Sequence, residues 1–500
     1  MTDAAPSPAA RPAVDSALHG VDLAALEPPV ALGALDGRYR GAVAPLVNHL
    51  SEAALNRARV HVEVEWLIHL AGNGVLPGAP ELTQADVAYL RRIVETLGAA
   101  EIAEMAAIEA ETRHDVKAVE YFLKRRLDAA PTVDTADGGP GADTALAGVH
   151  EIVHIFCTSE DINNLAYALV IRSAVHDVWL PAARMLRAKL ISLSRQAIGV
   201  PMLARTHGQA ATPVTLGKEL AVFTHRLTRQ LHRIEGAEYL GKINGATGTY
   251  AAHVIAVPGT DWEEVARTFV EGLGLTWNPL TTQIESHDWQ AELYSDVARF
   301  NRVLHNLATD VWTYISLGYF RQNLAAQGST GSSTMPHKVN PIRFENAEAN
   351  LELSSALFDT LASTLVTSRL QRDLTDSTTQ RNISVAFGHS LLALDNVTRG
   401  LAGLEIDAEA MARDLDANWE VLGEAVQSAM RAAGIAGATG MANPYERLKD
   451  LTRGRRVDAA GMRGFIGSLG LPDDVSARLL NLSPSSYIGL AAALERHLED

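Results

Sequence analysis

A polar loop in the second half of the chain carries the residues best suited to acid–base chemistry. Its core is Gly331-Ser332-Ser333-Thr334-Met335-Pro336-His337-Lys338-Val339-Asn340-Pro341, within what we call the 328–341 loop. Glycine and two prolines disfavour a regular helix or strand there. Hydroxyls, a cation and an amide between two long helical segments suit a lid over an anionic substrate. A polar surface connection is the alternative.

A histidine that could act as an acid or base occurs earlier in the chain. His207 lies in the run Arg205-Thr206-His207-Gly208-Gln209, shortly before a long helical pattern that starts at Leu216. A turn that contains glycine can present the imidazole to a cleft, whereas a structural histidine is the other interpretation. Beside a lid that carries hydroxyls, His207 and Ser332 could act as proton donor and acceptor.

Two further polar runs could bind anions. Gln283 precedes the helical pattern at Trp289, where it could either contact a substrate carboxylate or belong to an ordinary capping segment. Arg372, Ser377 and Arg381 lie around a short break between helices. They could grip a phosphate, for which arginine geometry is suited, or form a solvated network with nearby aspartates.

The run His150-Glu151-Ile152-Val153-His154 has the H-E-x-x-H pattern of zinc proteases. On an α-helix both imidazoles would share a face, and Glu151 could activate water. The pattern has only three fixed residues, so a helix with structural or solvent-facing histidines is the favoured alternative.

Most of the chain has the periodicity of long helices. Two apolar stripes recur at steps of three and four residues, and no proline occurs in 280–335 or 342–443. Alternating strand patterns are scarce. The sequence therefore predicts an all-α fold whose long helices form a bundle, shared between subunits. The stripes are Leu220, Phe223, Leu227, Leu231 and Ile234, and Trp289, Leu293, Val297, Phe300, Leu304, Leu307 and Val311.

Changes in composition and periodicity predict three helical domains after a tail. Residues 1–28, rich in alanine and proline, are expected to be disordered. A helical domain over 29–147 ends in a Gly/Asp/Ala-rich stretch, 128–148, predicted to be a flexible loop. The long-helix domain covers 148–401, and 402–500 form a smaller helical domain.

Bulk properties narrow the class of protein. The net charge of −16 disfavours nucleic acid and anionic membranes as partners, so an anionic substrate needs a local cluster of cations. One cysteine, Cys157, precludes an intrachain disulfide and suits the cytoplasm. We see neither a membrane-spanning run nor a signal peptide.

Several separate segments resemble one family. The 328–341 loop is similar to the signature loop of the fumarase/aspartase superfamily. Two runs elsewhere in the chain narrow the resemblance, within this superfamily, to the bacterial-type adenylosuccinate lyases. They are Cys157-Thr158-Ser159-Glu160-Asp161-Ile162-Asn163-Asn164 and Gln371-Arg372-Asp373-Leu374-Thr375-Asp376-Ser377-Thr378. Similar segments extend over nearly the whole chain. One departure is Arg113, where the enterobacterial pattern has asparagine.

The resemblance implies a reaction and a role for each matching residue. The family releases fumarate from succinylated purine ribonucleotides, without metal or cofactor, as a homotetramer whose sites combine segments of three chains. By position, His207 is the general acid, Ser332 the base, and His114 supports the acid. The succinyl group is assigned to Thr158, Ser159, Gln283, Ser333, Lys338 and Asn340. The phosphate and ribose are assigned to Arg38, Tyr39, Arg372, Ser377 and Arg381, with Asn346 nearby, and Arg113, Asp115, Val339 and Thr378 complete the predicted binding residues.

Three other hypotheses remain at this point. A different fumarate-releasing lyase, of the argininosuccinate lyase type, would not need the phosphate-binding arginines. A non-catalytic helical scaffold would not need both His207 and Ser332. A zinc hydrolase would contain bound metal.

Overall fold

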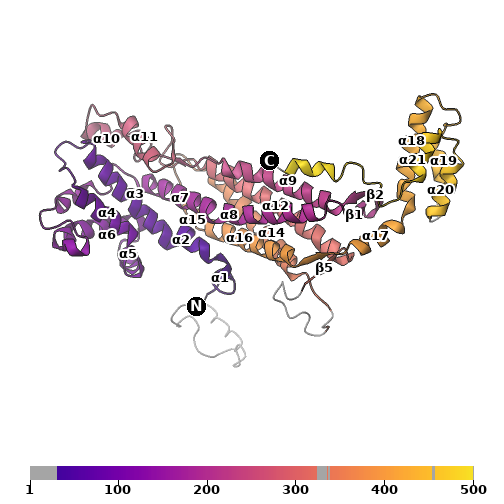
Figure 1. The fold of residues 1–500 in the computed structure, drawn as a ribbon. Helices are drawn as coiled ribbons and strands as arrows, with labels where there is room; N and C mark the ends of the chain where they lie inside the picture. Colours follow the sequence, from indigo (N-terminus) through magenta and orange to yellow (C-terminus); the bar gives the residue numbers. More distant parts are fainter. Residues whose placement is uncertain (1–30, 324–334, 336–337, 453–456, 499–500) are drawn as a thin grey trace, which may run out of the picture.

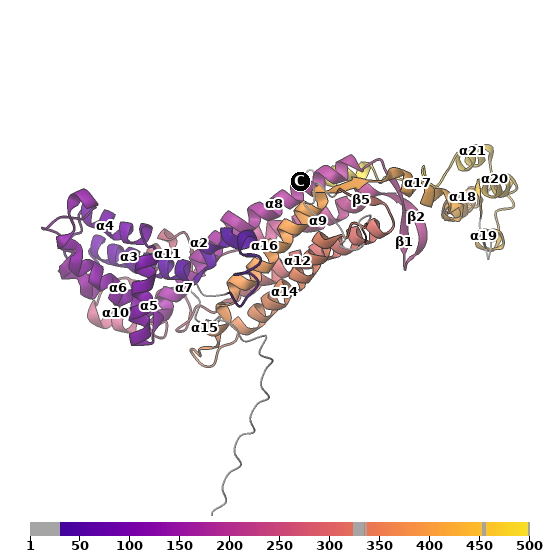
Figure 2. The same cartoon turned by 90° about the horizontal axis from the view of Figure 1, so that it is seen from below.

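The computed structural model describes residues 31–323, 335, 338–452 and 457–498. The predicted tail, 1–28, and most of the 328–341 loop, including Ser332 and Ser333, lie outside these residues. The described chain is elongated, with an N-terminal group of helices, a central bundle and a small C-terminal lobe in a row (Figures 1 and 2). Of the helices in these ranges, none is long and apolar enough to cross a membrane.

The N-terminal group begins and ends its helices at recognisable signals. Thr83 and Asp86 form a reciprocal capping box at the start of α4. α5 ends in a left-handed Arg113 (φ 57°), and α6 follows at once. The elements are α1 (Arg40–Val43), α2 (Val47–Leu50), α3 (Glu52–Gly72), α4 (Gln84–Glu95), α5 (Ala99–Thr112) and α6 (Asp115–Ala129), with the 3₁₀-helix η3 (Ala44–Leu46).

The stretch predicted to be a flexible loop, 128–148, is packed against this group instead. It contains three 3₁₀-helices, η4 (Ala130–Thr132), η5 (Thr135–Asp137) and the start of η6 (Leu146–Ile152). Leu146 is fully buried, and the Thr144 hydroxyl donates to Asp86 of α4. Buried anchors at intervals therefore hold a segment whose composition is that of a loop.

The central bundle confirms the predicted helical stripes. Every residue of both stripes is buried, because the two long helices that carry them, α9 and α12, pack against each other and against their neighbours. A π-helical turn, η7, precedes Pro181, which has no N–H for the preceding ladder. The elements are α7 (Ser159–Ala174), η7 (Val175–Trp179), α8 (Leu180–Gln196), α9 (Leu216–Glu235), α10 (Ala251–Ala256), α11 (Trp262–Gly272), α12 (Asp288–Ser316), α14 (Ile342–Leu365), α15 (Thr375–Gln380) and α16 (Ile383–Ala402).

Small sheets accompany the helices without changing the fold class. The described strands form an antiparallel hairpin, β1 (Pro201–Thr206) with β2 (Gln209–Thr215), and two further pairs. β3 (Leu240–Gly241) runs parallel to β4 (Thr276–Trp277), and β5 (Phe320–Gln322) pairs antiparallel with β6 (Leu404–Ile406). The predicted all-α class is confirmed, with the β1–β2 hairpin as its main exception.

The C-terminal lobe has a core of its own, which includes Trp419, Met430 and Met462. The last helix leaves this lobe and lies on the bundle, where Glu495 pairs with Arg195 at 2.7 Å (Figure 1). The elements are α17 (Ala408–Asp416), η8 (Trp419–Leu422), α18 (Gly423–Ile435), α19 (Pro444–Thr452), α20 (Ala459–Gly467), α21 (Asp473–Leu480) and η9 (Ala493–Leu498).

Candidate active site

The N-termini of α6 and α7 bring three of the predicted residues together. His114 is the N-cap of α6, where its Nδ1 accepts from the Lys117 N–H at 3.3 Å. Its Nε2 lies 3.4 Å from the hydroxyl of Ser159, the first residue of α7. Thr158 caps that helix. Two helix N-termini place positive dipole ends and hydroxyls around one point, an arrangement that favours a bound carboxylate.

A buried ion pair fixes the start of α7 from behind. Lys242 Nζ lies 2.8 Å from Asp161 Oδ1, and both side chains are fully buried. Asp161 also accepts from the backbone N–H groups of Thr158, Asn244 and Gly245. These bonds hold Thr158 and Ser159 against the 242–246 segment.

Gln283 and Arg372 form the next wall of the site. Gln283 donates to the Ala246 carbonyl at 3.0 Å and accepts from Arg372 at 3.5 Å. Arg372 also pairs with the buried Glu160 of α7 at 3.0 Å. A cleft of about 440 Å³ is lined by Gln283, Arg372 and Thr247, among others. Residues assigned separately to the succinyl group and the phosphate are thus in contact.

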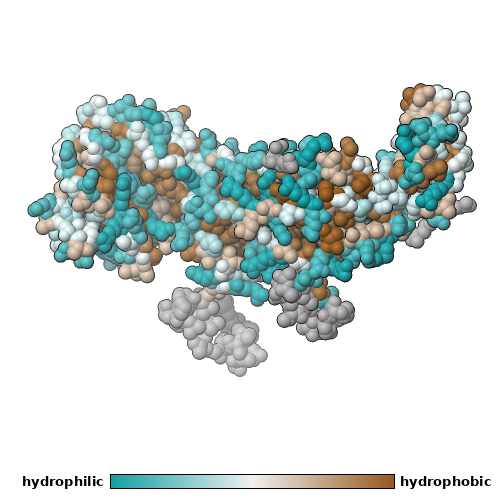
Figure 3. Space-filling view, in the orientation of Figure 1, coloured by the Kyte–Doolittle hydropathy of each residue, from teal (hydrophilic) through white to brown (hydrophobic). Residues whose placement is uncertain are grey.

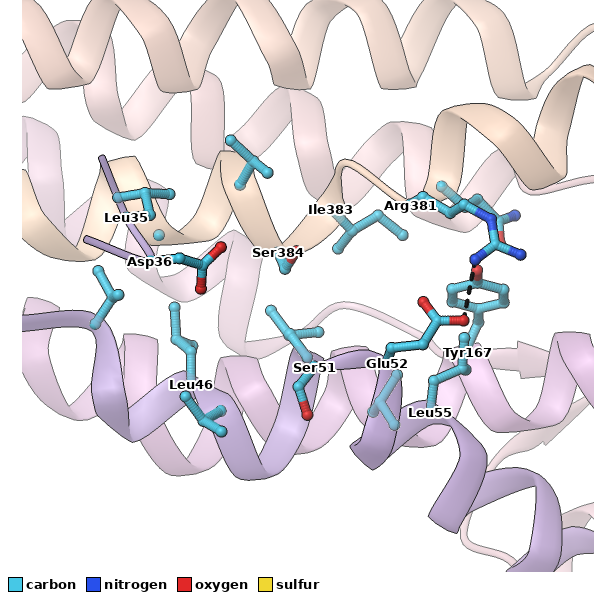
Figure 4. Close-up of a pocket in the computed structure, with 17 residues that line it drawn as sticks. Leu35, Asp36, Leu46, Ser51, Glu52, Leu55, Tyr167, Arg381, Ile383 and Ser384 are labelled. Carbon is cyan, nitrogen blue, oxygen red and sulfur yellow. Dashed lines mark hydrogen bonds and ion pairs between the residues drawn. The ribbon is translucent and has the colours of Figure 1, made fainter. Parts of the chain in front are cut away.

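Arg381 lies near the first residues of α3 and α6. Its guanidinium pairs with Glu52 at 3.0 Å and lies 3.6 Å from Asp115 Oδ2. Figure 4 shows the Arg381–Glu52 pair beside Tyr167 at one end of a groove of about 290 Å³, whose remaining lining is mostly apolar. Arg381 is 46% exposed, so a ligand can reach it.

Tyr39 and Asn346 form a separate contact along the bundle. Asn346 Nδ2 donates to the Tyr39 hydroxyl at 3.2 Å, and Arg38 lies over the Tyr39 ring, 5.9 Å from its centroid. Val339, at the described end of the 328–341 loop, precedes Asn346 by only a few residues in the sequence. Its carbonyl accepts a hydrogen bond from Gln322 at 2.8 Å.

The other predicted residues of the described chain contribute less to these contacts. Lys338 is exposed and Asn340 half-buried, and both lie just before α14. Ser377 is half-buried in α15, where its N–H donates to Asp376, and Thr378 is exposed beside it. Arg113 is exposed in a left-handed conformation that asparagine adopts more readily than arginine.

His207 does not lie with this cluster in one chain. It occupies the two-residue turn of the β1–β2 hairpin, with φ of 53° followed by 74° at Gly208, and it is exposed. The hairpin lies at the opposite end of the bundle from the N-termini of α6 and α7 (Figure 1). Arg205 of β1 donates to the Tyr319 hydroxyl at 2.9 Å, and Tyr319 directly precedes β5.

The zinc hypothesis does not survive the geometry of its motif. The helix that contains His150 is a 3₁₀-helix that ends at Ile152, and His154 has a left-handed backbone. His150 pairs with Asp128 and Glu151, whereas His154 pairs with Glu63. The two imidazoles therefore do not share an α-helical face, which the H-E-x-x-H motif requires.

The His154–Glu63 pair predicts a pH-dependent stability. Burial lowers the pKa of His154, but the hydrogen bond and charge of Glu63, with Glu120 and Asp161, outweigh it and raise that pKa above 6.5. The pair should therefore stabilise the fold below pH 6.5 and lose its effect as the pH rises through the folded-state pKa. We expect Glu63→Gln to lower the thermal midpoint more at about pH 6 than at about pH 8. An equal loss at both would contradict a charged pair.

Two groups of relevant residues were not predicted individually. Arg59 interrupts the apolar face of α3, and Glu160 and Asn163 lie on the buried side of α7. The sequence offered one signal: Arg59 lies at helical spacing from Leu55 and Trp66, on the apolar face of the helix. An arginine on such a face is rarely buried without partners. Lys242 gave no comparable signal.

Comparisons with known proteins identify relatives over nearly the whole chain. Residues 37–352 match the family profile described as "Lyase", and residues 368–488 match "Adenylosuccinate lyase C-terminal". The chain is 46% identical over 469 residues to adenylosuccinate lyase of Escherichia coli (strain K12), covering 94% of this chain and 98% of that protein. It is 44% identical over 468 residues to adenylosuccinate lyase of Haemophilus influenzae, with the same coverage.

Solved structures share the fold at lower identity. Fumarate lyase from Mesorhizobium sp. BNC1 superposes with a TM-score of 0.69 at 20% identity, covering 92% of this chain and 97% of that one. The 3-carboxy-cis,cis-muconate lactonizing enzyme from Pseudomonas putida gives 0.67 at 21%, covering 92% and 96%. Together with the first profile, this fold defines a lyase of the fumarase/aspartase superfamily.

Within that class, the identity to the curated relatives over nearly their whole length is decisive. The chain belongs to the adenylosuccinate lyase family. The predicted family is therefore confirmed, and an argininosuccinate lyase-like assignment is not supported.

Proposed function

We propose that this protein releases fumarate from adenylosuccinate, giving AMP, and from the succinocarboxamide ribotide SAICAR, giving AICAR. The observation that carries the proposal is the family membership over nearly the whole chain. It is supported by the cluster at α6 and α7, where hydroxyls, helix N-termini and arginines suit carboxylates and a phosphate.

The proposed reaction is an elimination that needs one acid and one base. Ser332 takes the proton from the carbon next to a carboxylate, the carbon–nitrogen bond breaks, and His207 gives a proton to the leaving nitrogen. The departing succinyl carbon skeleton becomes fumarate. Negative charge grows on the carboxylate as its neighbouring carbon loses the proton, and Lys338 and Asn340 are assigned to stabilise it. His114, bonded to Ser159, supports the acid.

We propose a homotetramer in the cytoplasm, with sites shared between chains. One argument is that the hairpin of His207 lies far from the α6–α7 cluster in the same chain, so both can belong to one site only if different chains supply them (Figure 1). A second is the apolar surface along the bundle, where Met185, Val222, Trp312 and Leu353 are exposed (Figure 3). Such patches on a soluble bundle mark contact surfaces. No nucleic acid, membrane or cofactor takes part in the proposed reaction.

An ultraviolet assay of fumarate release from both succinylated nucleotides tests this function. We expect turnover on both substrates by purified protein. If neither substrate is turned over, a non-catalytic scaffold is favoured. Turnover on argininosuccinate alone would overturn the assignment of the substrate.

The phosphate assignment predicts a selective loss at Arg381. Arg381→Ala should weaken AMP binding by about tenfold or more, because a charge-assisted contact to phosphate is lost, while fumarate binding changes little. Competitive inhibition by each product measures both affinities. Arg399→Ala, which removes an exposed pair with Asp395 on α16, is the control. Equal losses for AMP and fumarate would remove the phosphate role.

A further inference from the structure

Arg59 is a buried arginine at the centre of the contacts behind the site. It lies on α3 and is 2% exposed, and its guanidinium donates three hydrogen bonds. Nε donates to Asn163 of α7 at 2.9 Å, Nη2 to Asp115 of α6 at 2.8 Å, and Nη1 to Asn56 at 2.8 Å. Asn56 belongs to α3 itself, so the planar guanidinium joins α3 to α6 and α7 and fixes their relative positions.

One arm of this network leads to Arg381. Asp115 Oδ2 accepts from Arg59 at 2.8 Å, and the same oxygen lies 3.6 Å from Arg381 Nη2. Burial raises the pKa of Asp115, but Arg59, the Val116 N–H, His114 and Arg381 outweigh it and hold the pKa below its ordinary value. Asp115 is therefore an anion that is engaged by Arg59 and only loosely by Arg381.

The other arm leads to Arg372. Asn163, whose oxygen binds Arg59, donates through its amide nitrogen to Glu160 Oε1 at 2.9 Å. The same Glu160 oxygen lies 3.0 Å from Arg372 Nη2. The two arginines assigned to the phosphate are thus each held by a carboxylate that Arg59 binds directly or through one amide.

We propose that Arg59 is a positioning residue for phosphate binding, an inference that rests on the proposed function. Arg381 pairs with Glu52 through Nη1, and by occupying Asp115, Arg59 leaves Nη2 of Arg381 available to the phosphate of the substrate. Through α7 it also fixes the position of Arg372. Without Arg59, the Asp115 anion has Arg381 as its nearest cation and takes it from the ligand.

The test measures inorganic phosphate as a competitive inhibitor of fumarate release. Arg59→Met should raise the inhibition constant of phosphate about tenfold. The double variant Arg59→Met/Asp115→Asn should return it to within about threefold of the wild type, because the competing anion is gone. If Arg59 only stabilised the packing of the helices, the double variant would not recover phosphate inhibition. An unchanged constant in the single variant, or no recovery in the double, would overturn the proposal.

Further variants keep the test decisive. Should Arg59→Met fail to assemble, Arg59→Lys retains one cation near Asp115 and should raise the constant less than about threefold. A tenfold rise in that variant would count against charge as the cause. Arg91→Met removes a bidentate surface pair with Glu65 of α3 and should leave the constant unchanged.

The same assay separates this inference from the proposed function. An Arg381→Ala variant with normal phosphate inhibition would show that the phosphate assignment is wrong. If Arg381→Ala weakens inhibition while Arg59→Met does not, the assignment stands and the role of Arg59 is wrong.

Discussion

Replacing His207 with glutamine is expected to lower kcat by about 10²–10⁴-fold, the usual contribution of a positioned general acid. Glutamine keeps the size and polarity of the side chain but cannot supply the proton. The residue lies in an exposed hairpin turn, so the fold and the assembly should be unaffected. Steady-state kinetics with adenylosuccinate, beside size-exclusion chromatography, measure both. Normal turnover would refute the assignment of the acid.

The position of the hairpin allows a sharper version of this test. The hairpin of His207 lies at the opposite end of the bundle from the N-terminus of α6, where His114 lies, so a shared site must take the two residues from different chains (Figure 1). His114→Asn, which retains a capping side chain for α6, should also be nearly inactive. After dissociation and reassembly of an equal mixture with His207→Gln, about a quarter of the sites should be intact by random combination of symmetric subunits. A mixture with no recovered activity would contradict sites shared in this way.

The helices were predictable because their evidence is local. The stripe from Leu220 to Ile234 repeats with the period of a helix, and it is buried as expected. Thr83 and Asp86 cap α4 through bonds between near neighbours in sequence. The β1–β2 hairpin was missed because Pro201 and Pro213 lie in its strands, and proline disfavours a strand assignment. The turn also requires a positive φ at His207, a backbone conformation that residues with a Cβ rarely adopt.

The arrangement of the site was less predictable because long-range contacts decide it. Motif matches named His114, Ser159 and Arg372, but not the bonds that join them. The bond from His114 to Ser159 spans 45 positions, and that from Gln283 to Arg372 spans 89. Nothing local in the sequence places His207 away from the rest. The motifs identified the groups, and packing of α3, α6 and α7 determines which of them meet.

The second large effect concerns the buried pair behind the site. Lys242→Met should lower the free energy of unfolding by about 3–5 kcal/mol, because Asp161 would remain buried without its cation. Three backbone N–H groups still donate to Asp161, which places the effect toward the lower end of that range. Thermal and urea unfolding at fixed protein concentration measure the change.

The double variant Lys242→Met/Asp161→Asn decides whether an uncompensated charge is the cause. Removing both charges should restore most of the lost stability, since neutral groups of similar volume avoid the cost of burying an unpaired ion. Arg267→Met, which breaks an exposed pair with Glu264, should leave the free energy of unfolding nearly unchanged. A double variant as unstable as Lys242→Met would point to packing instead.

Because Asp161 holds the N–H of Thr158, the single variant should also raise KM for adenylosuccinate, and the double variant should restore it only in part.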